Sequence, residues 1–209
     1  MKTPSMAQGL NKKQQRSVNL DEETNALILA GAGSGKTRVL THRIHYLVSE
    51  KNNHVDNILA VTFTNKAANE MRERLGDLLR RPIGRMWVGT FHSIAHRILR
   101  THPAEANLSS TFQILDAQDQ FRIVKRLMKE NGVDETKFPI KKVQWFINQQ
   151  KDEGILPHQI DAGYNYFVKQ SAKIFDLYEK HCQANDLVDF AGLLVKSYEL
   201  LKNNQSLLD

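Results

Sequence analysis

The sequence has a single cysteine, Cys182, among 209 residues. One thiol cannot form an intrachain disulfide, which excludes a small secreted fold held together by disulfide bridges. Long apolar runs are also missing: none approaches the roughly 20 residues that a membrane-spanning helix needs, and residues 1–10 are too polar for a signal peptide. We therefore expect a cytoplasmic protein without a membrane partner.

Acidic residues are the minority among the charged residues. The sequence has 23 Asp and Glu and 29 Lys and Arg, which gives a net charge of +6. An excess of positive charge favours a polyanionic partner, and nucleic acid is the leading candidate. A basic enzyme whose charge only aids solubility is the alternative. The length and the 41% hydrophobic content allow one large or two small domains with a buried core.

Short apolar runs alternate with amphipathic segments as far as Gly89–His92. Apolar residues recur at helical spacing in residues 36–48 and 65–79, which predicts two helices. The three apolar runs read as buried strands and cover residues 26–29, 58–63 and 86–88. This order of strand, helix, strand, helix, strand predicts a parallel α/β sheet.

Helical patterns dominate after this boundary, and residues 112–115 are the one extended candidate. We expect a helix capped by Asp116 that ends near Asn131–Gly132, and further helices over residues 140–151 and 190–201. A longer helix places Phe167, Ile174, Tyr178 and Cys182 on one stripe. We assign Trp87, Trp145 and Phe146 to core packing.

A glycine-rich loop joins the first apolar run to the first long helix. Its residues are Ala30, Gly31, Ala32, Gly33, Ser34, Gly35, Lys36 and Thr37. Triphosphate binding needs backbone amides in a tight turn, followed by a helix N-terminus whose dipole favours anions. Lys36 can reach the β and γ phosphates, and the Thr37 hydroxyl can ligate Mg²⁺. The sequence therefore predicts a P-loop that binds ATP and Mg²⁺, with Lys36 and Thr37 in the catalytic centre.

The acidic strand end that should help to hold Mg²⁺ is missing from the sequence. Leu187, Val188 and Asp189 form an apolar run that ends in an acid, but the run is short and lies among helical segments. We read it as no strand. The predicted sheet also has few strands, so we expect this chain to be the N-terminal part of a larger enzyme.

Four motifs occur in an order that resembles the opening motifs of superfamily 1 DNA helicases of the UvrD, Rep and PcrA type. They lie at residues 10–14, 30–38, 60–68 and 88–93, and residues 151–154 and 187–190 also resemble the family. The resemblance covers nearly the whole chain, and Ala30 at the first loop position is normal for this family.

The resemblance implies an ATP-dependent enzyme that moves 3′ to 5′ on single-stranded DNA and unwinds duplex DNA in DNA repair. Its fold would be a partial P-loop NTPase (RecA-like) parallel sheet with an inserted all-helical subdomain. Residues 1–92 would belong to the first motor domain (1A) and residues 93–209 to the helical subdomain (1B). The implied partners are single-stranded and duplex DNA, the remaining motor domains of the same polypeptide, and repair proteins.

The resemblance also implies roles for single residues. Gln14 would read adenine and Arg38 would touch the nucleotide, although a solvated glutamine and a surface ion pair are the alternatives. Phe63 would stack on a DNA base, with a core position as its alternative. The residues that would line the same DNA path are Thr64, Asn65, Thr90 and His92.

Two other functions remain open from the sequence. The chain could be a stand-alone nucleic-acid-binding module that uses the P-loop only as a phosphate anchor. A small-molecule kinase would explain the loop but would leave residues 62–66 and 90–93 without a purpose. The basic residues of the helical part are Lys125, Arg126, Lys129, Lys141, Lys142, Lys169 and Lys173. Some of them would contact DNA phosphates if the family resemblance holds, and a solvated helix face is the alternative.

Overall fold

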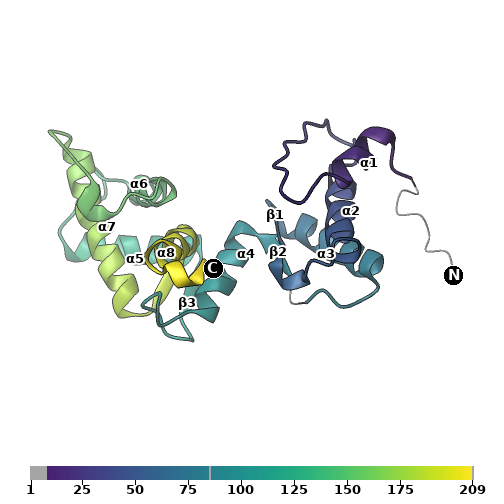
Figure 1. Cartoon of the computed structure of the whole chain (residues 1–209). Helices are drawn as coiled ribbons and strands as arrows, with labels where there is room; N and C mark the ends of the chain where they lie inside the picture. Colours follow the sequence, from purple (N-terminus) through teal and green to yellow (C-terminus); the bar gives the residue numbers. More distant parts are fainter. Residues whose placement is uncertain (1–8, 85, 209) are drawn as a thin grey trace. The chain divides into compact units, whose positions relative to one another are not determined.

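A computed structural model describes residues 9–84 and 86–208 of the chain. Most of residues 1–10, on which the prediction of no signal peptide rests, therefore lie outside the described residues. The chain divides into two compact units, Met1–Ile94 and Ala95–Asp209. In Figure 1 the first unit runs from purple to blue and the second from teal to yellow. Among the described residues, no helix is long and apolar enough to cross a membrane.

The first unit combines helices with a short parallel sheet. Its elements are α1 (Lys12–Val18), α2 (Lys36–Ser49), the 3-10 turn η1 (Val55–Asn57), β1 (Leu59–Thr62), α3 (Asn65–Leu79), β2 (Trp87–Thr90) and the start of α4 (Phe91–Thr101). These bounds confirm the helices predicted over 36–48 and 65–79 and the strands predicted within 58–63 and near 86–88. The mixed α/β class with parallel pairing is likewise confirmed and fits a partial P-loop NTPase domain.

Strands β1 and β2 pair in parallel, with Leu59 opposite Trp87 and Thr62 opposite Thr90. The apolar faces of α2 and α3 cover this sheet in a shared core. The buried members of that core are Ile44, Val48, Ile58, Ala60, Met71, Leu75, Met86 and Val88. Parallel strands buried against helices read as continuous apolar runs, which is why the sequence reveals both of them.

The strand predicted over residues 26–29 is not formed. Leu27, Ile28 and Leu29 lie in irregular structure and are 85%, 45% and 85% exposed. A strand is stable only when a neighbour satisfies its backbone groups and its side chains are covered. In the described part of the chain the sheet consists of β1 and β2 alone, so this apolar run has no paired neighbour.

The second unit is mostly helical. Its elements after α4 are β3 (Gln113–Leu115), α5 (Ala117–Glu130), α6 (Ile140–Asp152), the 3-10 turn η2 (Pro157–Gln159), α7 (Tyr166–Ala184), β4 (Leu187–Asp189), α8 (Phe190–Asn203) and the 3-10 turn η3 (Gln205–Leu207). The helices predicted over 140–151 and 190–201 are confirmed. Asp116 caps α5 as expected, because its carboxylate accepts from the amides of Gln118 and Asp119.

The core of the second unit lies among α5, α6 and α7. The stripe predicted on α7 is confirmed, since Ile174, Tyr178 and Cys182 are buried and Phe167 packs against them. Phe146 is 8% exposed and belongs to the interior, as predicted. The assignment of Trp145 to the core is wrong, because its side chain is 65% exposed.

The prediction of an all-helical second part is also wrong. Strands β3 and β4 pair in parallel, with Gln113 opposite Leu187 and Leu115 opposite Asp189. The extended candidate at 112–115 is therefore confirmed, whereas the dismissal of Leu187–Asp189 as a strand is corrected. Three residues carry little strand signal by themselves, and pairing with a distant segment stabilises them.

Candidate nucleotide and nucleic-acid site

The P-loop turns through two glycines with positive φ. Gly33 has φ +73° and Gly35 has φ +86°, a region that residues with a Cβ avoid. Gly35 is the N-cap of α2, whose first hydrogen bond runs from the Val39 amide to the Gly35 carbonyl. The amides of Lys36 and Thr37 therefore precede the first intrahelical bond and point out of the helix N-terminus.

The Lys36 ammonium lies inside the loop. Its Nζ donates to the carbonyl oxygens of Ala30 and Gly31 at 3.0 and 2.7 Å. The Ser34 hydroxyl also donates to the Gly31 carbonyl, at 2.7 Å. The loop thus keeps its cation at its own centre by means of backbone oxygens.

Two further predicted residues surround the loop. Gln14 reaches it from α1, where Nε2 donates to the Ser34 carbonyl at 3.0 Å. The other end of the same amide accepts from the Asn11 backbone and completes a capping box. Arg38 follows on the first turn of α2 and places its guanidinium against Gly9. The structure therefore brings Gln14 to the loop from a segment some twenty residues earlier in the chain.

The residues of this loop fit a Mg²⁺-bound nucleoside triphosphate. A Cβ added at Gly31 or Gly33 would meet nothing within 4 Å, so the approach to the loop is open. The donor set consists of backbone amides and one ammonium, which suit phosphate oxygens, and one hydroxyl at Thr37, which suits a hard cation. Thr37 is half-buried on the first turn of α2.

A second group of predicted residues lies where β1 and β2 end. Phe63 follows β1 and is 94% exposed, and Phe91 follows β2 and is 54% exposed. Their ring centroids are 6.2 Å apart with a tilt of 55°. Because the two strands are parallel and in register, both aromatic side chains emerge at the same edge of the sheet. Sequence reasoning missed Phe91, although its position after a strand matches that of Phe63.

The polar residues of this edge cap the two helices that follow the strands. Thr64 is the N-cap of α3, where its hydroxyl accepts from the Ala67 amide at 3.2 Å. Thr90 and Ser93 exchange hydrogen bonds, from the Thr90 amide to Ser93 Oγ at 2.8 Å and from the Ser93 amide to Thr90 Oγ1 at 3.2 Å. Both threonine hydroxyls accept in these caps, so each can still donate to a phosphate or sugar oxygen.

The remaining two predicted DNA-path residues lie on the first turns of these helices. Asn65 is the exposed first residue of α3, and His92 is the half-buried second residue of α4. All five predicted DNA-binding residues therefore lie at the ends of β1 and β2 or directly after them. The structure thus gathers them at one edge of the sheet.

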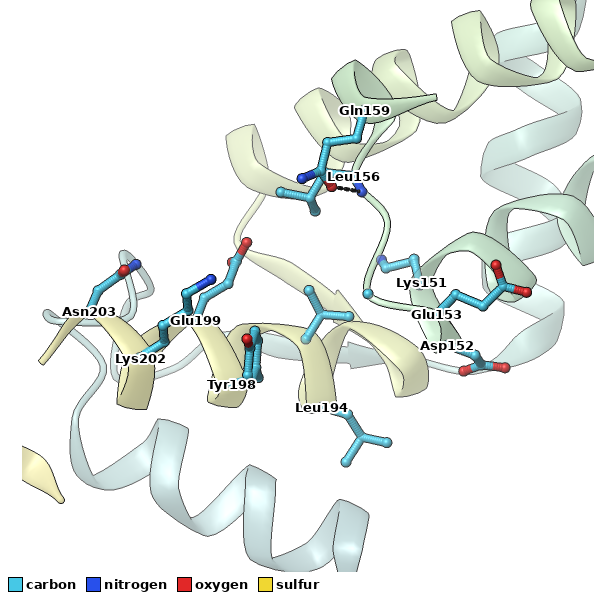
Figure 2. A pocket seen from close by; sticks show the side chains of 12 residues that line it. Lys151, Asp152, Glu153, Leu156, Gln159, Leu194, Tyr198, Glu199, Lys202 and Asn203 are labelled. Atoms are coloured by element: carbon cyan, nitrogen blue, oxygen red, sulfur yellow. Dashed lines mark hydrogen bonds between the residues drawn. The ribbon is translucent and has the colours of Figure 1, made fainter. Parts of the chain in front are cut away.

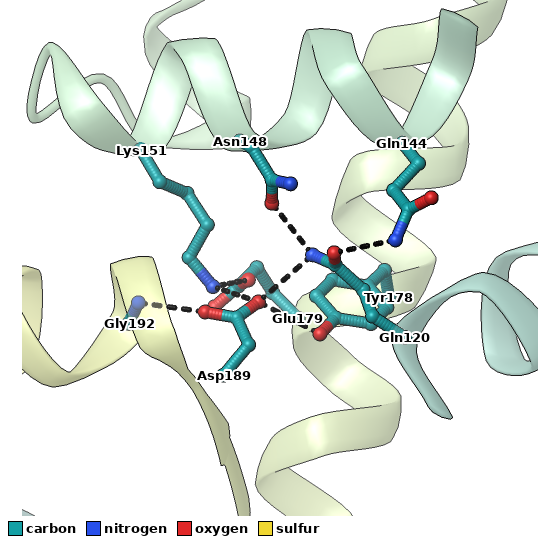
Figure 3. Close-up of polar contacts among 8 residues, drawn as sticks. All are labelled: Gln120, Gln144, Asn148, Lys151, Tyr178, Glu179, Asp189 and Gly192. Atoms are coloured by element: carbon teal, nitrogen blue, oxygen red, sulfur yellow. Dashed lines mark hydrogen bonds and ion pairs between the residues drawn. The ribbon is translucent and has the colours of Figure 1, made fainter. Parts of the chain in front are cut away.

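The motifs at residues 151–154 and 187–190 meet in the interior of the second unit (Figure 3). Lys151 is 5% exposed, and its ammonium lies 2.7 Å from Glu179 and 2.9 Å from Asp189. Asp189 also accepts from the Tyr178 hydroxyl at 2.7 Å, from Gln120 Nε2 at 3.2 Å and from the Gly192 amide at 2.6 Å. One carboxylate thereby joins α5, α6, α7 and α8.

The contacts of this cluster stabilise the protonated forms of Lys151 and Tyr178. Burial opposes the charged form of Lys151, but the carboxylates of Asp189 and Glu179 raise its pKa above the ordinary value. Burial and the nearby Asp189 charge raise the pKa of Tyr178, so its hydroxyl stays a donor. Both carboxylate oxygens of Asp189 accept hydrogen bonds from these partners. Asp189 is therefore a structural residue rather than a ligand for Mg²⁺.

A pocket of about 540 Å³ lies next to this cluster. It is lined by the end of α6 with the segment after it and by the last three turns of α8. Figure 2 shows Leu194, Tyr198 and Lys202 of α8 on one side and the segment around Leu156 on the other. The lining mixes acids, lysine and apolar side chains. This mixture does not single out one class of ligand.

Known proteins match this sequence along almost the whole chain. The profile described as "UvrD/REP helicase N-terminal domain" matches residues 10–209. DNA helicase II of Salmonella typhimurium is 50% identical over 199 residues, which is 95% of this chain and 28% of that protein. DNA helicase II of Haemophilus influenzae is 46% identical over 212 residues, covering 100% of this chain and 29% of its own length.

ATP-dependent DNA helicase PcrA of Bacillus subtilis is 38% identical over 203 residues, which is 96% of this chain and 27% of that protein. The chain thus spans somewhat more than a quarter of the length of these relatives.

Proposed function

The chain belongs to the UvrD/REP helicase family, and we propose that it supplies the ATP-binding loop and part of the DNA path of an ATP-dependent DNA helicase. Membership confirms the resemblance drawn from the four ordered motifs. In the proposed enzyme, movement is 3′ to 5′ along single-stranded DNA, and unwinding of duplex DNA serves DNA repair. The first unit belongs to the first motor domain, and the second unit is its inserted subdomain.

The observation that carries this proposal is the arrangement of Lys36, Gln14 and the two glycine turns. When bound, ATP would supply the phosphoryl group whose transfer to water releases the free energy for movement, and Mg²⁺ would neutralise charge on the phosphate oxygens. Lys36 leaves the carbonyls of Ala30 and Gly31 and stabilises negative charge on phosphate oxygens. Thr37 offers its hydroxyl to the cation, and Gln14 directs an amide towards the base.

The DNA strand lies along the edge where β1 and β2 end. Phe63 offers an exposed ring to a base, which favours stacking without a requirement for sequence. Thr64, Asn65, Thr90 and His92 contribute small donors for phosphates and sugars. Catalysis needs groups that the motifs of this chain do not supply, among them the acid at the end of a later strand that helps to hold Mg²⁺. We propose that the remaining motor domains of the full enzyme provide them.

The experiment is ATP turnover with and without single-stranded DNA, measured for the 209-residue chain and for the full-length protein. We expect DNA-stimulated hydrolysis only in the full-length protein. Robust DNA-stimulated hydrolysis by the 209 residues would refute the claim that other motor domains are essential. Tight DNA binding by the chain with a steep salt dependence, and no effect of ATP, would favour the alternative of a stand-alone nucleic-acid-binding module.

A further inference from the structure

Trp145 is exposed in the middle of α6, on the side of the helix opposite the core. Its side chain is 65% exposed, whereas Val143 and Ile147 on the same helix are 1% and 0% exposed. Gln144, Asn148 and Lys151 of this helix point towards the polar cluster in Figure 3. A single exposed apolar side chain is common and proves nothing by itself. The neighbours of the indole therefore decide what it can do.

Two lysines flank the indole. Lys141 and Lys142 precede Trp145 by four and three residues, which places one on each side of it along the helix surface. A tryptophan side chain on a helix leans towards the N-terminus and hence over these lysines. Both lysines are exposed, and within residues 9–84 and 86–208 neither forms an ion pair.

Acidic side chains are scarce around this surface. Residues 136–151 contain none, and the flanking acids are Glu135 and Asp152. Asp152 lies two turns beyond the indole. On the neighbouring α5, the carboxylate of Asp119 pairs with an arginine at 2.8 Å, and that of Asp116 caps the helix. The surface of Lys141, Lys142 and Trp145 therefore keeps an uncompensated positive charge beside a flat aromatic face.

We propose that this surface of α6 binds single-stranded nucleic acid, with one base stacked on Trp145 and the adjacent phosphates held by Lys141 and Lys142. An unpaired strand offers both an anion and a planar ring at every nucleotide, and this pair of groups matches the surface. An acidic peptide would satisfy the lysines but would leave the indole without a planar partner. A two-fold contact with a second copy would bring the lysines of both copies together.

The surface lies in the second unit. It shares no residue with the P-loop or with the edge of the sheet where β1 and β2 end. The inference therefore goes beyond the proposed function and can fail without it. Because the sequence has two tryptophans, a Trp87→Phe background leaves Trp145 as the sole indole. Trp87 is a half-buried residue of β2, and phenylalanine keeps an aromatic side chain there while it removes the second ring and the indole N–H.

The first test follows the fluorescence of Trp145 in the Trp87→Phe chain during titration with oligothymidylate. Stacking should quench the indole, and an abasic oligonucleotide of equal length should leave it nearly unchanged. Equal quenching by both ligands, or by an oligoglutamate peptide, would overturn the proposal. Circular dichroism confirms that each variant is folded.

The second test measures the affinity of the 209-residue chain for labelled oligothymidylate. Trp145→Ala should weaken binding by about 5- to 150-fold, and Trp145→Phe should restore most of it. The double variant Lys141→Ala/Lys142→Ala should lower the slope of log Kd against log salt by about 1.4, since each phosphate contact to a single strand contributes about 0.7. The matched control is Lys125→Ala/Lys129→Ala on α5, which removes two exposed lysines without an adjacent indole and should leave the slope unchanged.

Phe63→Ala, measured alongside, separates the two proposals. If Phe63→Ala weakens binding and Trp145→Ala does not, the α6 surface is not a DNA contact and the proposed function stands. If only Trp145→Ala weakens binding, the role of Phe63 fails and the α6 surface stands.

Discussion

Phe63 and Phe91 face each other across the ends of two parallel strands, with 6.2 Å between their ring centroids. The pair exists because Thr62 and Thr90 are register partners and each is followed directly by a phenylalanine. A tilted arrangement of two rings at this distance is favourable. Phe91 therefore supports the orientation in which Phe63 presents its ring to solvent.

Phe63→Ala should weaken single-stranded DNA binding by about 5- to 150-fold, which corresponds to about 1–3 kcal/mol for the loss of one stacked base. The ring is 94% exposed and its pairing with Phe91 is its one ring contact among the described residues, so its removal should lower the stability of the fold only slightly. Fluorescence anisotropy with a labelled oligonucleotide measures the affinity. Phe63→Tyr is the matched control and should retain it, whereas equal affinities for all three proteins would contradict the stacking role.

Lys36→Ala should abolish ATP hydrolysis by the full-length enzyme, because the ammonium that stabilises the transferring phosphate is lost. The fold should persist, since the lysine is exposed and, within the described residues, its ammonium donates to the loop carbonyls of Ala30 and Gly31. Steady-state turnover and circular dichroism check the two statements. Unchanged turnover would refute the assignment of Lys36.

Gly89→Ala should disturb the edge of the sheet where β1 and β2 end, because Gly89 lies inside β2. A Cβ at this position would clash with Ser93 Oγ and lie 3.3 Å from Ile94 Cδ1, and Ser93 is the partner of Thr90. We expect a loss of about 1–3 kcal/mol of unfolding free energy, as for other overpacked sites, together with weaker DNA binding. Gly76→Ala on α3 is the control, because its Cβ would meet nothing within 4 Å. Urea titration should show that the control is at least as stable as the wild type.

Asp189→Ala should destabilise the second unit by about 3–5 kcal/mol, because it leaves the buried Lys151 ammonium short of its partner. The same change removes the acceptor of Tyr178 and the cap of α8. Glu179→Ala should cost much less, since the Glu179 side chain is 28% exposed and water can replace it. The urea midpoints of the two variants provide the comparison, and similar losses would show that the cluster is not centred on Asp189.

Acidification should lower the stability of the second unit. Burial, together with the nearby Arg100 charge, lowers the pKa of His96 below its ordinary value of 6.5. Burial and Arg126 do the same for His181. The unfolded chain therefore binds protons near pH 6.5 while the folded chain binds them only at lower pH, so the free energy of unfolding falls as the pH drops through this window.

Urea midpoints at pH 7.5, 6.5 and 5.5 test this dependence. His96→Gln keeps an acceptor for the Arg100 guanidinium, which donates to His96 Nε2 at 3.0 Å, but has no ionisable group. The variant should show a shallower decline with falling pH. A decline as steep as that of the wild type would exclude His96 as a contributor.

Sequence patterns predicted those features that local chemistry determines. Helix α6 could be placed because apolar residues recur at helical spacing between Pro139 and Gly154. The P-loop could be placed because its glycines and Lys36 are contiguous in the chain. The exposure of Trp145 could also have been predicted, since the helical period places it on a different face from Val143 and Ile147. Its assignment to the core rested on its aromatic character alone.

Features that depend on distant segments could not be read in this way. Strand β4 has three residues and exists through its pairing with β3, far earlier in the sequence. The apolar residues 27–29 have the composition of a buried strand, but burial requires a neighbour that composition does not reveal. The cluster around Asp189 draws on four helices, so no short motif could disclose it.

The equal length and shared register of β1 and β2 restrict how this sheet can vary. Side chains alternate between the two faces of a strand, so the loss or gain of one residue turns every later side chain over. Such a change in β1 would place Phe63 on the opposite face of the sheet, and a change in β2 would do the same to Phe91. It would also shift the first residue of α3 relative to that of α4 by one strand position. Substitutions such as Val61→Ile leave that alignment untouched, so we expect variation among relatives in the identity of the strand residues rather than in their number.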